Sequence, residues 1–115
     1  MSNKGVLKNL TRCTRKSEPF DSDWERDYML VLEEDTTVKQ WERCRSLKIP
    51  YKKDNGSAGY YNPDFIVERV DGKKEIHEVK GGHLMAEENT QRKFEAGDKF
   101  CRARGMVFKV ITRGK

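Results

Sequence analysis

Two carboxylates and a lysine lie close together near the middle of the sequence, in NPDFIVERVDGKKEIHEVKGG (62–82). Asp64 precedes one apolar run, and Glu78 and Lys80 end a second run. The Asp-Gly pair between the runs predicts a tight hairpin, and alternation along a strand places Glu78 and Lys80 on one face. If Asp64 and Glu78 meet across this hairpin, their charges repel each other unless a cation lies between them.

This arrangement is suited to the hydrolysis of a phosphodiester. A hard divalent ion such as Mg²⁺ prefers carboxylate oxygens and retains several waters. Such an ion polarises a phosphate and lowers the pKa of an attacking water. Lys80 would lie beside that water, where an ammonium can orient it or offset the charge that grows on the phosphate. The following Gly81 and Gly82 would allow a nucleic-acid backbone to come close.

The elements that must position these residues can be read from periodicity and turn signals. Helical spacing and a Ser22 to Glu25 capping box predict a helix over 23–34. A second helix is expected over 90–104, with Asn89 or Thr90 at its start and Gly105 at its end. Strands are expected at 38–44, 49–53, 63–70, 73–80 and 106–112, with a turn or loop at 54–59. The order predicts an α/β fold with a central mixed β-sheet flanked by two helices.

The motifs together resemble a known family. Pro63-Asp64 and the Glu-Val-Lys at 78–80 resemble the PD-(D/E)XK nuclease signature. With the S-x-x-E at 22–25, the V-x-x-W at 38–41, IPY, NPDF, the DG turn and FKVIT, residues 20 to 112 resemble the N-terminal domain of TnsA-type transposon endonucleases. The resemblance implies a restriction-endonuclease-like core and a DNA endonuclease that uses Mg²⁺, with Mn²⁺ as a substitute. It also implies a site made by Glu25, Asp64 and Lys80, with Glu78 at the variable acidic position and the main-chain carbonyl of Val79 as a further metal ligand.

Basic and aromatic residues around this site are the candidates for DNA contact. The chain carries a net charge of +5, and its first 16 residues hold five basic side chains and no acid. A basic balance favours polyanionic partners. Aromatic rings can stack on bases and basic side chains can hold phosphates. The residues expected to contact nucleic acid are Tyr60, Tyr61, Gly81, Gly82, His83, Gln91, Arg92 and Lys93.

Other interpretations of the same residues stay open. Glu25 follows Ser22 at the spacing of a capping box, so it can serve the helix alone or also the site. His77 alternates away from Glu78 and is expected to be structural, whereas Glu75 is expected to be solvated. The same fold could bind nucleic acid without cutting it, or act as a Holliday-junction resolvase, which would require a homodimer.

Domain organisation and compartment are expectations as well. We expect a basic lead-in at 1–20 and a single nuclease domain at 21–115. TnsA proteins carry a second domain that meets transposition partners, and the chain ends where that domain would begin. A small stand-alone nuclease of a phage or mobile element is therefore expected, and beside DNA its expected partner is a second copy of the chain or a protein of that element. Three widely spaced cysteines without a CxxC, no signal segment and no apolar run of membrane-spanning length favour the cytoplasm, that of the host for a phage protein.

Overall fold

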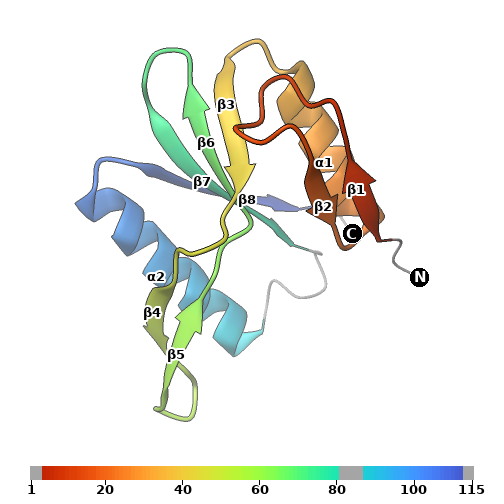
Figure 1. The fold of residues 1–115 in the computed structure, drawn as a ribbon. Helices are drawn as coiled ribbons and strands as arrows, with labels where there is room; N and C mark the ends of the chain where they lie inside the picture. Colours follow the sequence, from red (N-terminus) through yellow and green to blue (C-terminus); the bar gives the residue numbers. More distant parts are fainter. Residues whose placement is uncertain (1–3, 81–86, 113–115) are drawn as a thin grey trace.

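A computed structural model describes residues 4–80 and 87–112 of the 115-residue chain, and its centre is a four-stranded mixed sheet (Figure 1). The strand order is β3-β6-β7-β8, antiparallel from β3 to β7 and parallel between β7 and β8. Two helices accompany the sheet, α1 (Asp23–Glu34) and α2 (Glu88–Ala103). The strands are β3 (Val38–Arg43), β6 (Phe65–Arg69), β7 (Lys74–Lys80) and β8 (Val107–Thr112). This arrangement confirms the α/β fold with a mixed sheet and two helices, compatible with a restriction-endonuclease-like core.

The main hydrophobic core lies between the sheet and α1. Met29 and Leu32 of α1 pack with Val38, Trp41 and Phe65, all of them buried. Strict alternation along β3 would place Val38 and Trp41 on opposite faces. The register shifts between Val38 and Gln40, and this irregularity allows both side chains to enter the core.

Helix α2 packs against the other face of the sheet through a close approach to β8. A Cβ added at Gly97 would lie 2.6 Å from the ring of Phe108, so only glycine fits at this contact. Phe94 and Tyr61 also pack on Phe108, with ring centroids 6.0 and 6.3 Å away. The expected side-chain cap is absent, because the N-cap is Glu87 without a capping bond and Asn89 instead accepts from the Asp54 amide. Gly105 ends the helix region with φ +69, as expected.

The N-terminal residues are more ordered than a basic lead-in implies. They form a two-stranded antiparallel sheet of β1 (Gly5–Leu7) and β2 (Glu18–Phe20), which the sequence analysis missed. The connecting segment lies along β3, where Cys13 forms a parallel bridge with Trp41. Glu33 of α1 holds this segment by accepting from the amides of Thr11 and Arg12 at 2.7 and 2.9 Å.

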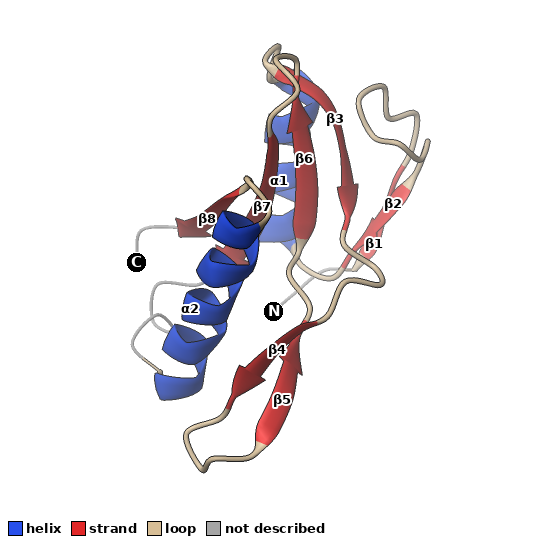
Figure 2. Ribbon diagram, turned by 90° about the vertical axis from the view of Figure 1, so that its left-hand side faces the viewer, coloured by secondary structure: helices blue, strands red, loops and turns tan. Residues whose placement is uncertain are grey.

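A second hairpin projects beside the central sheet (Figure 2). It pairs β4 (Ile49–Lys52) with β5 (Ala58–Tyr61), so the residues from 58 on belong to a strand and not to the loop predicted for 54–59. Gly56, with φ +87, provides the left-handed residue of the turn. The hairpin places Tyr61 opposite Ile49 and brings it next to β7.

The expectation that Glu75 is solvated is wrong, because its side chain enters a buried polar network. Glu75 is 7% exposed and its Oε1 lies 2.7 Å from Nε2 of His77 and 2.9 Å from Nη2 of Arg69. The hydroxyl of Tyr28 lies 2.5 Å from Nδ1 of His77 and links the network to α1. His77 is thus a buried structural histidine. In the described ranges, no helix has both the length and the apolar character needed to cross a membrane.

Candidate active site

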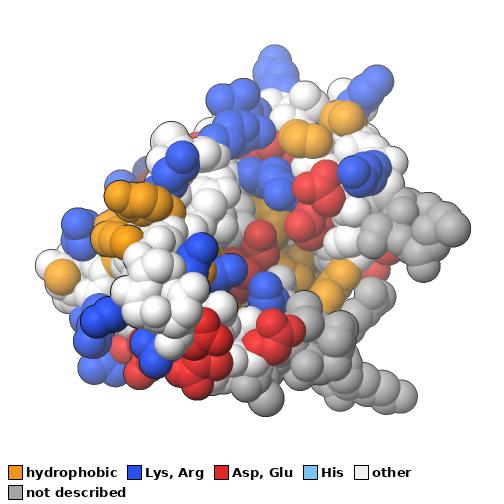
Figure 3. Space-filling view, turned by 90° about the horizontal axis from the view of Figure 1, so that it is seen from below, with side chains coloured by type: hydrophobic (Ala, Val, Ile, Leu, Met, Phe, Trp, Pro, Cys, Tyr) orange, Lys and Arg blue, Asp and Glu red, His pale blue; other side chains and the backbone are white. Residues whose placement is uncertain are grey.

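Asp64 and Glu78 are brought together by the pairing of β6 with β7. Phe65 pairs with His77, so Asp64 and Glu78 are the next residues along the two antiparallel strands. Asp64 Oδ2 accepts a hydrogen bond from the Val79 amide at 2.8 Å, and Glu78 Oε1 accepts one from the Tyr61 hydroxyl at 2.6 Å. Both carboxylates are thereby fixed. Acidic side chains gather around a hollow on the face seen in Figure 3, with Lys and Arg side chains at its border.

Burial and charge repulsion make this pair of carboxylates costly to ionise. Burial is the largest cause of the raised pKa of Asp64, and the charge of Glu25 raises it further. Burial also raises the pKa of Glu78, and the neighbouring charge of Asp64 adds to the effect. Lys80 acts in the opposite direction on both pKa values. The pair therefore favours an added proton or a bound cation.

Lys80 ends β7 on the same face as Glu78, as the alternation predicts. It pairs with Thr112 of β8 and is half-buried. Its positive charge is felt by Asp64 and by Glu78, so the three side chains form one electrostatic unit. Val79, between the two site residues, anchors Asp64 through its amide.

Glu25 serves the helix start and also lies close enough to influence the site. Ser22 caps α1 by accepting from the Glu25 amide at 3.2 Å. The Glu25 carboxylate accepts from the Asp21 amide at 2.8 Å and from Nη1 of Arg43 at 2.9 Å. The reciprocal bond of the predicted capping box thus goes to Asp21 and not to Ser22. Because the charge of Glu25 raises the pKa of Asp64, its capping and electrostatic roles coexist.

Two residues that the sequence analysis did not place at the site lie in contact with it. Arg43 of β3 pairs with Glu25, and its charge lowers the pKa of Asp64. The sequence contains one indication of this position, because Arg43 lies two residues after Trp41 and so on the core-facing side of the strand. Tyr61 was expected to contact nucleic acid, but it is 4% exposed and its hydroxyl is used by Glu78. It therefore positions Glu78, and no local sequence signal indicates that role, because no strand was predicted over β5.

The other candidates for DNA contact differ in how available they are. Tyr60 is 70% exposed on the outside of the β4–β5 hairpin. Arg92 is paired with Glu88 at 2.7 Å, and its Nη1 donates to the Lys52 carbonyl at 3.4 Å. Lys93 lies 5.8 Å from the ring centroid of Tyr51. Gln91 lies beside them in the first turn of α2. Gly81, Gly82 and His83 fall outside the described residues.

The donor set fits a hard divalent cation held by few protein ligands. Among the described residues, no group of three or more His, Cys, Asp or Glu side chains is arranged as a complete metal cluster. One oxygen of each carboxylate is held, Asp64 Oδ2 by the Val79 amide and Glu78 Oε1 by the Tyr61 hydroxyl, and the Asp64 amide also donates to the Glu78 carboxylate. Mg²⁺ suits such a site because it binds through one or two carboxylates and keeps its waters.

Comparison with known proteins identifies the family. The family model described as TnsA-like endonuclease N terminal matches residues 35–113, which is more than half of the chain. The match includes Asp64, Glu78 and Lys80, whereas Glu25 lies before it. No curated protein matches the sequence. The chain therefore belongs to the family of TnsA-like endonuclease N-terminal domains, a nuclease family.

Proposed function

We propose that this protein is a metal-dependent endonuclease that hydrolyses phosphodiester bonds in DNA. The observation that carries the proposal is the pair of buried carboxylates, Asp64 and Glu78, with Lys80 on the same face of the strand. A structural ion pair would not need two acids, because one carboxylate would satisfy one lysine. Burial raises the pKa of both acids, and the charge of Asp64 raises that of Glu78 further, which instead favours a site that receives a divalent ion.

Each residue has a proposed role. Asp64, Glu78 and the main-chain carbonyl of Val79 hold Mg²⁺, or Mn²⁺ in its place, and Glu25 supports the metal or its water. When bound, the ion supplies Lewis-acid polarisation of the scissile phosphate and a more acidic water. Lys80 orients the attacking water and offsets the charge that develops on the phosphate. Tyr61 keeps Glu78 in place from the neighbouring hairpin.

DNA is the proposed substrate because basic and aromatic groups surround this site. The net charge of +5 attracts a polyanion, and the exposed ring of Tyr60 lies one residue from Tyr61, which contacts Glu78. Tyr60 can stack on a base or sugar near the cut. Gln91, Arg92 and Lys93 provide phosphate contacts at the start of α2, and Gly81, Gly82 and His83 complete the proposed contact set.

Nicking of supercoiled plasmid by the wild type and by Lys80→Ala tests the proposal. The wild type is expected to cut with Mg²⁺ or Mn²⁺ and to stop when a chelator is added. Lys80→Ala should lose at least about a hundredfold in rate, within the range of general acid–base and electrostatic contributions, while it still binds DNA. Lys73→Ala, an exposed lysine in the turn of the same hairpin, is the matched control and should cut normally.

The outcomes separate the alternatives. Equal cutting by Lys80→Ala and the wild type would contradict the assigned site. Metal-independent DNA binding without cutting of plasmid or four-way junctions would favour a non-catalytic binding module. Cutting confined to junctions would instead favour a resolvase.

A further inference from the structure

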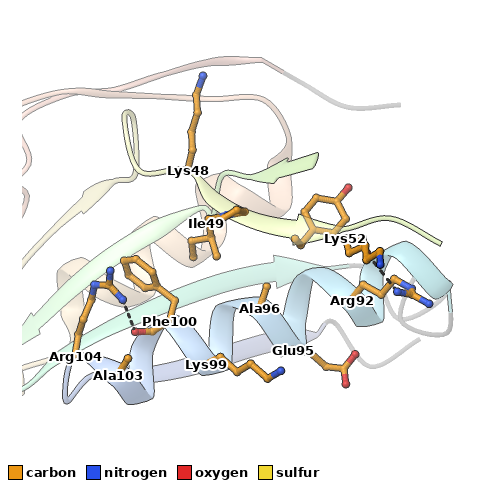
Figure 4. A pocket seen from close by; sticks show the side chains of 12 residues that line it. Lys48, Ile49, Lys52, Arg92, Glu95, Ala96, Lys99, Phe100, Ala103 and Arg104 are labelled. Carbon is orange, nitrogen blue, oxygen red and sulfur yellow. Dashed lines mark hydrogen bonds between the residues drawn. The ribbon is translucent and has the colours of Figure 1, made fainter. Parts of the chain in front are cut away.

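A groove runs between strand β4 and helix α2, apart from the candidate active site (Figure 4). Its volume is about 630 Å³, and of the residues proposed for the nuclease function it contains only Arg92. One wall consists of residues 48–52 and the other of one side of α2 from Arg92 to Ala103, with Arg104 at the end of the helix. At a rise of about 1.5 Å per residue, this side of α2 is about 18 Å long.

The border of the groove is strongly basic. Five of its lining side chains are positive and one, Glu95, is negative; the positive ones are Lys48, Lys52, Arg92, Lys99 and Arg104. In the part of the chain that the structure describes, no carboxylate lies within 4.0 Å of the Lys48, Lys52 or Lys99 ammonium. These cations are available to an acidic partner.

The floor of the groove is apolar. Ile49, Ala96, Phe100 and Ala103 line it between the basic borders. It continues into a second hollow of about 270 Å³ that shares Phe100 and Arg104 and adds Leu47 and Met106. An apolar floor with basic borders is complementary to a ligand that has apolar side chains on one face and carboxylates at its flanks.

The local contacts indicate which ligand fits. An added β-strand is poorly served by β4, because Pro50 has no N–H and the Lys52 carbonyl already accepts from Arg92. A stacked base is disfavoured at Phe100, because the Arg104 guanidinium covers its ring at 3.7 Å and also donates to the Phe100 carbonyl. A helix lying in the groove needs neither free backbone groups nor an open ring face.

We propose that this groove docks an acidic amphipathic helix of a partner protein. Apolar residues at helical spacing would lie on Ala96, Phe100 and Ala103, while flanking Asp or Glu side chains would meet Lys48 and Lys99. A helix of about three turns matches the length of the α2 wall. The proposal stands independently of whether the domain cuts DNA.

A fluorescent peptide of about 16 residues, with leucines at i, i+4 and i+7 and glutamates at the flanks, is the probe. Its binding is followed by anisotropy, and a labelled 20-base-pair duplex serves as the competing probe. Lys48→Glu/Lys99→Glu reverses the border charge and should weaken peptide binding about tenfold or more. Lys8→Glu/Lys16→Glu makes the same charge change at exposed positions of the N-terminal segment, away from α2 and β4 (Figure 1), and should leave peptide binding nearly unchanged. Ala96→Arg fills the floor while adding positive charge, and it should also abolish peptide binding.

The Ala96→Arg variant distinguishes a helix from nucleic acid. If the groove takes a helix, this variant loses the peptide but binds the duplex at least as well as the wild type. The proposal is overturned if the peptide does not bind at about 1 mM, if a scrambled peptide of equal charge binds equally, or if Ala96→Arg leaves peptide binding intact. If the wild type does not bind the peptide and Lys48→Glu/Lys99→Glu loses duplex binding, the groove is assigned to DNA. Circular dichroism of each variant confirms that it is folded, and Lys80→Ala should bind the peptide as the wild type does.

Discussion

At the scale of single residues, the hydroxyl of Tyr61 is a sensitive test of how Glu78 is held. Tyr61→Phe removes the 2.6 Å bond to Glu78 and changes little else, because the ring keeps its contact with Phe108. A group that orients a metal ligand contributes about 10- to 100-fold to metal affinity or activity. We therefore expect weaker Mn²⁺ binding by calorimetry and slower cleavage that excess Mn²⁺ partly restores. Tyr60→Phe is the matched control and should leave Mn²⁺ affinity unchanged.

Glu25 can be separated into its two roles by removing its charge alone. Glu25→Gln keeps an oxygen that can accept from the Asp21 amide and from Arg43. We expect the free energy of unfolding to change by less than about 1 kcal/mol, since the capping bonds survive in neutral form. Cleavage should fall at least about tenfold if the carboxylate supports the metal or its water. Unchanged cleavage would restrict Glu25 to the helix start.

The site shows what residue patterns can and cannot predict. The alternation of β7 correctly placed Glu78 and Lys80 on one face, since period 2 is a local property of any strand. The role of Tyr61 depends on where a separate hairpin lies, which is set by tertiary packing. Arg43 was missed because its partner, Glu25, is 18 positions away in another element.

At the scale of the elements, the packing of α2 on β8 depends on Gly97. Ala is a better helix former than Gly by about 1 kcal/mol, so Gly97→Ala would stabilise an exposed helix. Here the new methyl would lie 2.6 Å from the Phe108 ring, and overpacking costs about 1–3 kcal/mol. We expect net destabilisation in urea unfolding, whereas Glu95→Ala on the exposed side of α2 should be nearly neutral. A gain in stability for Gly97→Ala would show that the ring can move aside.

The elements that the sequence predicted well are those with a strong local signal. The helix over 23–34 coincides with α1, where Ser22 caps the first turn. The hairpin around Asp71 and Gly72 was also correct, because Gly72 adopts the left-handed φ of +91 that the turn requires. Strands β1 and β2 escaped notice because they have three residues each, too few to show a period. They are stabilised by distant partners, such as Arg45, which pairs with the buried Glu18.

At the scale of the whole molecule, two sets of buried titratable groups change the stability of the fold with pH in opposite directions. Burial raises the pKa of Glu75, but its bonds to Arg69 and His77 and the charge of Lys109 outweigh this effect and lower it to about 2. A lowered pKa stabilises the fold above the unfolded value and is lost as pH falls, here between about 4.5 and about 2. Burial lowers the pKa of His77, so protonation of the unfolded chain below about 6.5 also favours unfolding in acid.

Asp64 and Glu78 have the opposite sign, and this gives the last prediction. Their raised pKa values mean that the metal-free folded state binds protons more tightly than the unfolded chain, so these two groups destabilise the fold at neutral pH and less in acid. In chelator at pH 8, Asp64→Asn/Glu78→Gln should exceed the wild type in unfolding free energy by at least about 2 kcal/mol, since each pKa unit corresponds to about 1.4 kcal/mol and both pKa values are raised by more than one unit. The difference should shrink as the pH falls to about 4, where the folded wild-type acids are protonated and those of the unfolded chain, with ordinary pKa values of 3.8 and 4.5, are about half protonated. The comparison with the variant cancels the shared contributions of Glu75 and His77.

Mn²⁺ at pH 8 should raise the melting temperature of the wild type and not of the variant, because the cation replaces the protons only where the carboxylates remain. A difference that stays constant between pH 8 and pH 4 would mean that the pKa values of the two carboxyls are not raised in the folded state. The argument for a cation between them would then lose its basis.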